Sequence, residues 1–284
     1  MGLTVWTDGL FAGAVYALVA LGLAIVYQPT HVVNFAQGEA LVLGAVVGYE
    51  VLSVRGWGWG AAIAIAIAAG AALGLLQERA IMLPVRLSGS RFAWIIATLA
   101  VALILQSLYL INESGAVLRP EPLVDGAIRG VAWQKLVVIG AAVAVTVGYD
   151  VFLRRSAFGR AVRATAYDPG TAALMAVPVR GVVVFSFAVS CAITAFAGLL
   201  AAPALFVGPA DGLQFAVKGF IAAVIGGVGS PRGALAGGLV VGLLDSFVAA
   251  DVDASIGGVL VYGVLGILLI AFPTGLMGTR TRSH

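Results

Sequence analysis

A succession of long apolar runs, separated by short segments that carry charged or turn-forming residues, constrains the fold of this chain more than any other feature. The runs cover about residues 8–27, 36–54, 59–78, 92–112, 134–153, 181–203, 214–228, 233–250 and 254–272. A helix of roughly 20 apolar residues crosses the hydrocarbon core of a bilayer. The runs therefore predict an all-α, polytopic transmembrane helical bundle of about eight to ten spans, some of them interrupted at glycines.

The composition agrees with a membrane protein. Only 10% of the residues are charged and 61% are hydrophobic, whereas soluble domains have roughly 25% charged residues. A soluble domain of this composition could not cover its surface with polar groups. We treat residues 1–284 as one transmembrane domain, and we expect no cleaved signal peptide because no Lys or Arg precedes Arg55. Glycines spaced four apart, which allow close helix packing, occur at Gly9/Gly13, Gly233/Gly237 and Gly238/Gly242.

Arginines are concentrated in a few loops, and this pattern orients the chain. The segments 79–91 and 154–180 and the C-terminal tail are rich in arginine, so we place them in the cytoplasm. The segments 113–133 and 251–253 are neutral to acidic and are expected outside. Alternation along the nine runs then puts the N-terminus outside. If the short run 214–228 is re-entrant instead, the number of crossings and the N-terminal side both change.

A few polar residues fall inside the predicted spans. Asp150 and Glu50 lie near span ends and are expected at the membrane boundaries. Glu39 and Asp245 lie within spans, where a charge is costly and marks either a solute pathway or a buried pair. Both interpretations stay open for these two acids. Gln106 is a further polar residue inside a span.

Two breaks interrupt the apolar pattern, at residues 28–38 and 226–233. Non-helical backbone at membrane depth survives only inside protein or beside a wet cavity, and such breaks often mark the binding region of a transporter. The alternative is that both breaks are ordinary surface turns. We predict a substrate pathway or gate at these breaks, formed by Asn34, Gln37, Glu39, Gly226, Gly227 and Gly229.

Energy-converting and catalytic motifs are missing from the sequence. The Gly-rich stretch GGVGSPRG (226–233) lacks the Lys-Ser/Thr of a phosphate-binding loop. The single cysteine, Cys191, can form no internal disulfide, and neither a catalytic triad nor metal-ligand spacing is visible. We therefore expect a transport subunit without an ATPase site, enzymatic activity, cofactor, metal or nucleic-acid partner.

Three stretches, in order along the chain, resemble the LivH-type permeases of branched-chain amino-acid ABC importers. The first is the opening span with VVNFAQGEALVLGA (32–45), similar to the family's "NFAHGE" signature with Gln37 in place of His. The second is RRSAFGRAVRATAYDPGTAALMAVPVRGV (154–182), which departs from the family near Ala176 and Pro178. The third is KGFIAAVIGGVGSPRGALAGGLVVG (218–242), and the ending FPTGLMG (272–278) also matches.

The resemblance implies that the cytoplasmic segment 154–180 contacts a separate ATPase and transmits its conformational change to the permease. The sequence favours short helices there, because Ser156 is a suitable N-cap and Asp168-Pro169 suits a second helix start. The alternative is a merely solvated positive loop. The residues expected to couple to the ATPase are Gly159, Arg160, Arg163, Asp168 and Leu174.

The resemblance also implies the partners and the solute. The partners would be a second, LivM-like permease in a heterodimer, cytoplasmic ATP-binding subunits, a periplasmic or lipid-anchored solute-binding protein, and the lipid of a bacterial inner membrane. The solute would be a branched-chain amino acid, with urea or a short amide as the alternative. Two other classes compete: an ion-coupled secondary transporter, for which Glu39 and Asp245 are the candidate acids, and a membrane scaffold or channel without energy input.

Overall fold

The computed structural model describes residues 3–88, 92–113, 118–128 and 130–251, together with residues 263, 266 and 267. Its membrane-length helices are α1 (Leu3–Thr30), α3 (Trp59–Ser88), α4 (Ala93–Glu113), α5 (Trp133–Arg155), α8 (Val179–Ala201) and α10 (Pro231–Asp251). The others are α2 (Gln37–Gly48) with its π-helical continuation η1 (Tyr49–Val54), α6 (Ala157–Tyr167), α7 (Pro169–Leu174) and α9 (Gly212–Gly226). A small antiparallel hairpin joins β1 (Ala127–Ile128) to β2 (Val131–Ala132).

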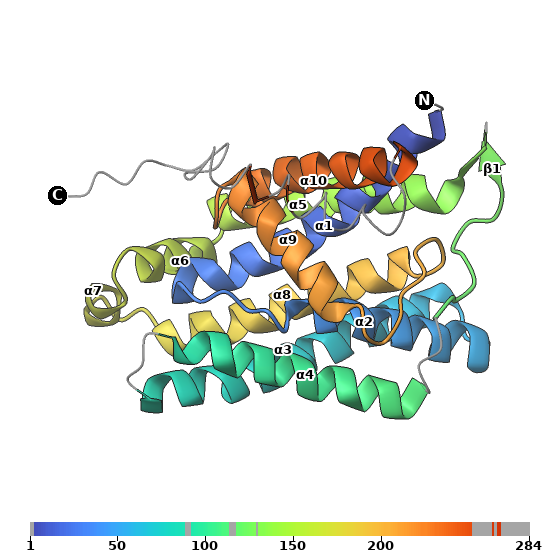
Figure 1. Cartoon of the computed structure of the whole chain (residues 1–284). Coiled ribbons are helices and arrows are strands. Elements are labelled where there is room, and N and C mark those ends of the chain that lie inside the picture. The colour runs from blue at the N-terminus through green and yellow to red at the C-terminus, as the bar shows by residue number, and fades with distance from the viewer. Residues whose placement is uncertain are drawn as a thin grey trace.

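Seven helical stretches in the described part of the chain are long and apolar enough to cross a membrane. They correspond to the predicted runs up to residue 250 except 214–228, so the prediction of an all-α, polytopic bundle is confirmed. That remaining run is α9, which has 15 residues and a length of only about 22 Å, less than the roughly 30 Å of a hydrocarbon core. Of the two alternatives stated for this run, its length therefore favours a helix that does not cross the core on its own. Residues 202–211 and α9 together connect the end of α8 to the start of α10 (Figure 1).

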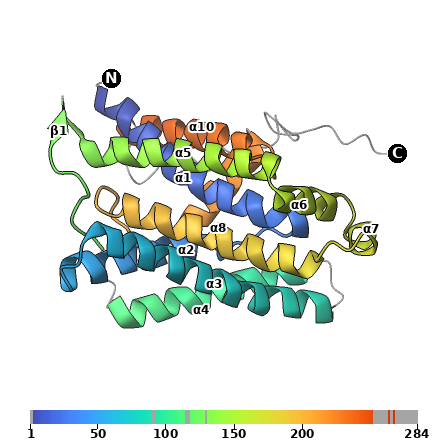
Figure 2. The same ribbon diagram turned by 180° about the vertical axis from the view of Figure 1, so that it is seen from behind.

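Helix α1 lies at the centre of the bundle, where it contacts α10, α8, α9 and α5 (Figures 1 and 2). Its apolar side chains are buried almost all round, as expected of a helix that faces protein rather than lipid. The outer helix α4 shows the opposite pattern, because Ile96, Leu103 and Ile111 are exposed. These apolar side chains form a surface that suits lipid.

Small residues bring the central helices into backbone contact. A Cβ atom added to Gly242 of α10 would overlap the backbone of Gly13 in α1, and one added to Gly238 would overlap Ala17. The glycine pairs that the sequence singled out therefore pack helices within this chain. Such close approach stabilises membrane helices through van der Waals contact.

The two breaks lie close to their predicted positions but have different shapes. Helix α1 continues through Pro29 to Thr30, so the first break is residues 31–36, which run back into the bundle before α2 begins (Figure 1). The second break is a tight turn between α9 and α10, in which Gly227 and Gly229 have positive φ angles of 103° and 86°. Glycine is the residue that adopts this backbone region without strain.

The basic loop predicted at 79–91 is largely helical, because α3 extends to Ser88. The N-terminus and the β1–β2 hairpin lie at the end of the bundle opposite α6 and α7, in accord with the charge-based orientation (Figure 1). The last predicted span (254–272), the 272–278 match, most of the acidic turn at 251–253 and the basic tail lie outside the described residues.

Candidate functional site

A buried polar network surrounds the point where α2 begins. The Asn34 side-chain amide donates to Gln77 Oε1 at 2.8 Å, and Gln37 Nε2 donates to Thr194 Oγ1 at 2.6 Å. Ser190 Oγ is 2.9 Å from Gln37 Oε1, which accepts its hydrogen bond. All five side chains are at most 1% exposed.

The network joins the break to three helices. Gln77 comes from α3, Ser190 and Thr194 come from α8, and Ser190 Oγ is also within 2.7 Å of the Gly22 carbonyl of α1. Gln77 Nε2 donates to the Ala36 carbonyl at 3.0 Å, which supports the non-helical backbone directly. Buried amides with satisfied partners fix one arrangement of the chain. Asn34 and Gln37 therefore hold the break in place.

Glu39 lies in the first turn of α2, close to this network, but takes no part in it. Its side chain is 1% exposed, and neither carboxylate oxygen has a hydrogen-bond partner among the described residues. Its neighbour is the start of α9, since a Cβ atom built on Gly212 would overlap the Glu39 carboxylate. A Cβ atom on Gly38 would likewise overlap the Gly212 carbonyl. The N-termini of α2 and α9 thus meet inside the bundle.

Helix α4 packs against the contact between α2 and α9 and forms hydrogen bonds to both sides of it. Tyr109 Oη donates to the Glu39 backbone carbonyl at 3.2 Å, and Gln106 Nε2 donates to the Ala210 carbonyl at 3.2 Å. Phe35 from the first break lies between Trp94 of α4 and Phe220 of α9, with ring centroids 6.4 Å and 5.7 Å away. One helix therefore touches both sides of the contact between α2 and α9.

The predicted gate residues fall into two groups. Asn34, Gln37 and Glu39 are together, whereas Gly226, Gly227 and Gly229 are at the far end of α9, about 20 Å away along the helix axis. The glycine turn is tied to its surroundings by Gln28, whose side-chain amide donates to the Gly229 carbonyl. It is therefore not part of the Glu39 region.

Asp245 is the second acid that the sequence left open, and it is paired. Its Oδ2 atom lies 2.7 Å from Lys218 Nζ of α9 and accepts a hydrogen bond of 2.5 Å from Tyr16 Oη of α1. The ion pair ties α9 and α10 to the central helix. Asp245 is therefore a member of a buried pair, which is one of the two alternatives stated for it above.

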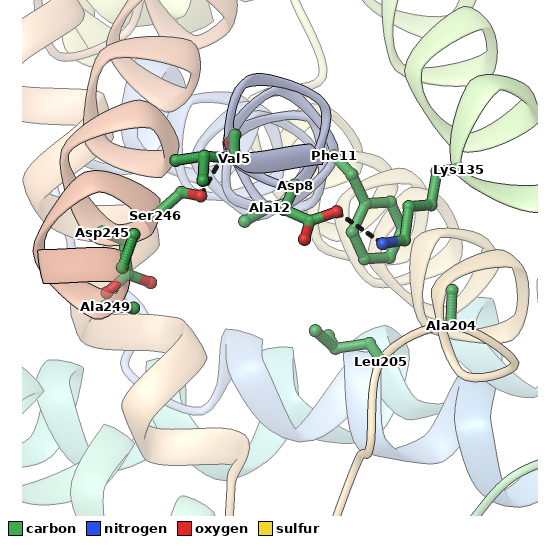
Figure 3. A pocket seen from close by; sticks show the side chains of 11 residues that line it. Val5, Asp8, Phe11, Ala12, Lys135, Ala204, Leu205, Asp245, Ser246 and Ala249 are labelled. Carbon is green, nitrogen blue, oxygen red and sulfur yellow. Dashed lines mark hydrogen bonds and ion pairs between the residues drawn. The ribbon is translucent and has the colours of Figure 1, made fainter. Parts of the chain in front are cut away.

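A cavity of about 410 Å³ opens beside Asp245, and Val5 and Asp8 from the first turns of α1 line it (Figure 3). Its walls include Val5, Phe11 and Leu205, with Asp245 on one side. On the other side Lys135 donates to Asp8 at 2.5 Å. Apolar walls with a few convergent charges are typical of small-molecule sites.

The segment 154–180 forms the two predicted helices, and both predicted caps are confirmed. Ser156 Oγ accepts from the Gly159 N–H at 2.9 Å at the start of α6. At the start of α7, Asp168 accepts hydrogen bonds from the Thr171 hydroxyl at 2.5 Å and the Gly170 N–H at 2.9 Å. These bonds, the Thr171 one foremost, hold the pKa of the exposed Asp168 carboxyl below its usual value.

The two short helices project from the bundle and expose apolar side chains (Figure 2). Tyr167 is 95% exposed and Leu174 is 88% exposed, and Met175 is also exposed. In contrast, Arg163 donates to the Leu153 carbonyl at 2.6 Å, and a Cβ atom on Gly159 would overlap that same carbonyl. Gly159 and Arg163 therefore anchor α6 to α5, whereas Leu174 faces outward.

A charged cluster links this anchor to the glycine turn. Asp150 lies 3.0 Å from Arg154 Nε and 3.0 Å from Arg232 Nη2 of α10. Asp150 therefore lies near the end of α5, as predicted, and it is paired with two arginines just before the projecting helices. Sequence reasoning did not identify this pairing, nor the roles of Gln77, Ser190 and Thr194.

Residues 5–273 match the protein family described as "Branched-chain amino acid transport system / permease component". This match covers nearly the whole chain. The chain belongs to that family. It is a multi-pass membrane protein and a permease subunit, as the apolar helices and the resemblance indicated.

Curated relatives agree with the family assignment. The chain is 29% identical to the high-affinity branched-chain amino acid transport system permease protein LivH of Escherichia coli strain K12, over 95% of this chain and 94% of that protein. BraD of Pseudomonas aeruginosa, described in the same words, is 29% identical with the same coverage. A probable branched-chain amino acid transport permease protein LivH of Methanocaldococcus jannaschii is 29% identical over 92% of this chain and 85% of its own length.

Among solved structures, PsaBC from Streptococcus pneumoniae in complex with Fab shares the fold of this permease. The TM-score is 0.50 at 16% sequence identity, and the similarity covers 95% of this chain and 91% of that chain. At this level of identity the comparison concerns the arrangement of helices alone.

Proposed function

We propose that this permease forms part of the solute pathway of an ABC importer and that the pathway passes between the broken elements α2 and α9. The observation that carries the proposal is the meeting of Gly38 and Glu39 with Gly212 inside the bundle of a permease-family chain. Non-helical backbone at this depth survives only inside protein or beside a wet cavity, and in transporters such breaks often mark the binding region. The polar network of Asn34 and Gln37 keeps one side of the path fixed.

The projecting helices α6 and α7 are the proposed docking element for a separate ATPase. An exposed group of large apolar side chains beside a loop rich in arginine suits a protein partner better than lipid or water. Leu174 and Met175 would enter a cleft of the ATPase, while Gly159 and Arg163 transmit its movement to α5. Arg160 and Asp168 complete this element, Asp168 through its cap on α7.

The proposed solutes are branched-chain amino acids, because the named relatives transport them and because the chain matches these relatives over almost its full length. The complete importer would contain a second permease of the LivM type, cytoplasmic ATP-binding subunits and a periplasmic or lipid-anchored solute-binding protein. Urea is the competing solute. The pairing of Asp245 with Lys218 leaves that acid poorly suited to couple transport to an ion gradient.

Co-purification of the tagged permease with its genomic neighbours tests the proposal. The purified complex is placed in nanodiscs, and its ATPase rate is measured with a binding protein loaded with leucine or with urea. We expect an ATPase subunit to co-purify and leucine-loaded binding protein to stimulate it. Stimulation by urea alone would change the solute, and purification without any ATPase subunit would overturn the assignment to an ABC importer.

A further inference from the structure

Glu39 stands apart from the other acids discussed for the bundle. Asp245 and Asp150 each lie within 3.0 Å of a basic side chain, whereas both carboxylate oxygens of Glu39 are buried without a hydrogen-bond partner among the described residues. A buried carboxylate without partners is costly unless another group stabilises it or a ligand occupies the site. Its surroundings therefore need an explanation.

The carboxylate is directed at the start of a helix. It lies against Gly212, the first residue of α9, and Glu39 itself belongs to the first turn of α2. Neither helix has a side-chain N-cap, since Ala36 precedes α2 and the Asp211 carboxylate accepts from the Gly208 N–H instead. Two uncapped helix N-termini thus converge on one carboxylate.

A helix N-terminus carries roughly half a positive elementary charge, so two of them together attract about one negative charge. In the present closed arrangement the Glu39 side chain occupies the position between the two helix ends. If α2 and α9 separate, the helix ends offer donors to an anion and the carboxylate offers acceptors to a cation.

We infer that Glu39 and the N-termini of α2 and α9 form a binding site for the zwitterionic head of an α-amino acid. The solute carboxylate takes the place of the Glu39 carboxylate at the helix ends, and the Glu39 carboxylate accepts hydrogen bonds from the solute ammonium group. Phe35, which packs between α4 and α9 nearby, faces the apolar tail. This inference rests on the proposed transport of amino acids.

The neighbouring contacts explain how such a site opens. The segment before α9 is non-helical, and α4 touches both partners through Tyr109 and Gln106. A movement of α9 away from Gly38 exposes the carboxylate and both helix ends together. Asn34 and Gln37 stay in place because their hydrogen bonds go to α3 and α8.

The test compares Glu39→Gln with the wild type in the complete importer complex in nanodiscs. Tritiated leucine is bound to the complex in the absence of the binding protein. It is then displaced by unlabelled leucine or by 4-methylpentanoate, which has the same tail and carboxylate but no ammonium group. The ratio of the two apparent affinities measures the preference for leucine. We expect the wild type to prefer leucine and Glu39→Gln to reduce this preference by about tenfold or more, the effect of losing one charge-assisted hydrogen bond. Glu50→Gln is the matched control, since Glu50 lies in the continuation of the same helix and pairs with the exposed Arg55.

Each result decides between alternatives. A reduced preference for leucine in Glu39→Gln, with an unchanged thermal unfolding midpoint and an unaffected Glu50→Gln, supports the site. An unchanged preference in Glu39→Gln, or no leucine binding by the wild-type complex, overturns it. A wild-type complex that takes up leucine while Glu39→Gln behaves identically refutes this inference alone. A wild type that takes up no leucine with its loaded binding protein refutes the proposed function instead.

Discussion

Replacing Lys218 by methionine should destabilise the permease by breaking the ion pair that joins α9 to α10. The two side chains are 11% and 22% exposed, so water only partly compensates for a lost partner. Removing one member of a buried pair costs about 3–5 kcal/mol because the other charge stays behind. Tyr16 still donates to Asp245, so we expect the lower end, about 3 kcal/mol.

The thermal unfolding midpoint in detergent or nanodiscs measures the effect. In a chain of this size 1 kcal/mol corresponds to roughly 2–4 °C, which predicts a fall of about 6–12 °C for Lys218→Met. The double variant Lys218→Met/Asp245→Asn removes both charges and keeps an acceptor for Tyr16. It should return to within about 1 kcal/mol of the wild type. Arg55→Met, which breaks the exposed pair with Glu50, should cost less than about 1 kcal/mol.

Two results would refute this reasoning. One is a Lys218→Met variant as stable as the wild type. The other is a double variant no more stable than the single one, since the cost would then come from the lost packing of the lysine stem and not from the uncompensated Asp245 charge.

Three further predictions concern the helix contact and the projecting helices. Gly38→Ala should lower the unfolding midpoint and abolish leucine uptake, because the added methyl overlaps the Gly212 backbone carbonyl, whereas Gly140→Ala, which meets nothing within 4 Å, should do neither. Leu174→Ser should leave the unfolding midpoint unchanged and weaken ATPase binding about tenfold or more, measured by pull-down titration, and unaltered binding would exclude this residue from the interface. Asp168→Ala should speed hydrogen exchange in α7 at pH 7. Because the folded pKa lies below the ordinary 3.8, the stabilising effect is complete above that value and disappears as the pH falls through the folded pKa, so a difference that grows as the pH falls below 3.8 would contradict the cap.

Local features of the sequence predicted local structure well. The caps at Ser156 and Asp168 follow from side chains that bond to backbone N–H groups two or three residues away, so no distant contact is needed. The helix positions follow equally from the lengths of the apolar runs. The glycine turn at 226–229 was visible because positive φ angles favour glycine.

Long-range packing was not predictable in the same way. The sequence does not indicate that Gln77 and Thr194 reach the break after α1, because hydrogen bonds between helices far apart in the chain leave no local pattern. The choice between a pathway role and a pair for Asp245 depended on Lys218, which lies 27 residues away on another helix. The length of α3 beyond residue 79 was missed since arginine is itself a good helix former.

The central claim is that this permease moves branched-chain amino acids with energy from a separate ATPase. Uptake of radiolabelled leucine into proteoliposomes that hold the complete complex, with loaded binding protein present at the face opposite α6 and α7, tests it most directly. We expect uptake only when ATP is supplied at the α6–α7 face, and none from a proton or sodium gradient alone. Leucine uptake driven by an ion gradient without ATP would contradict the claim.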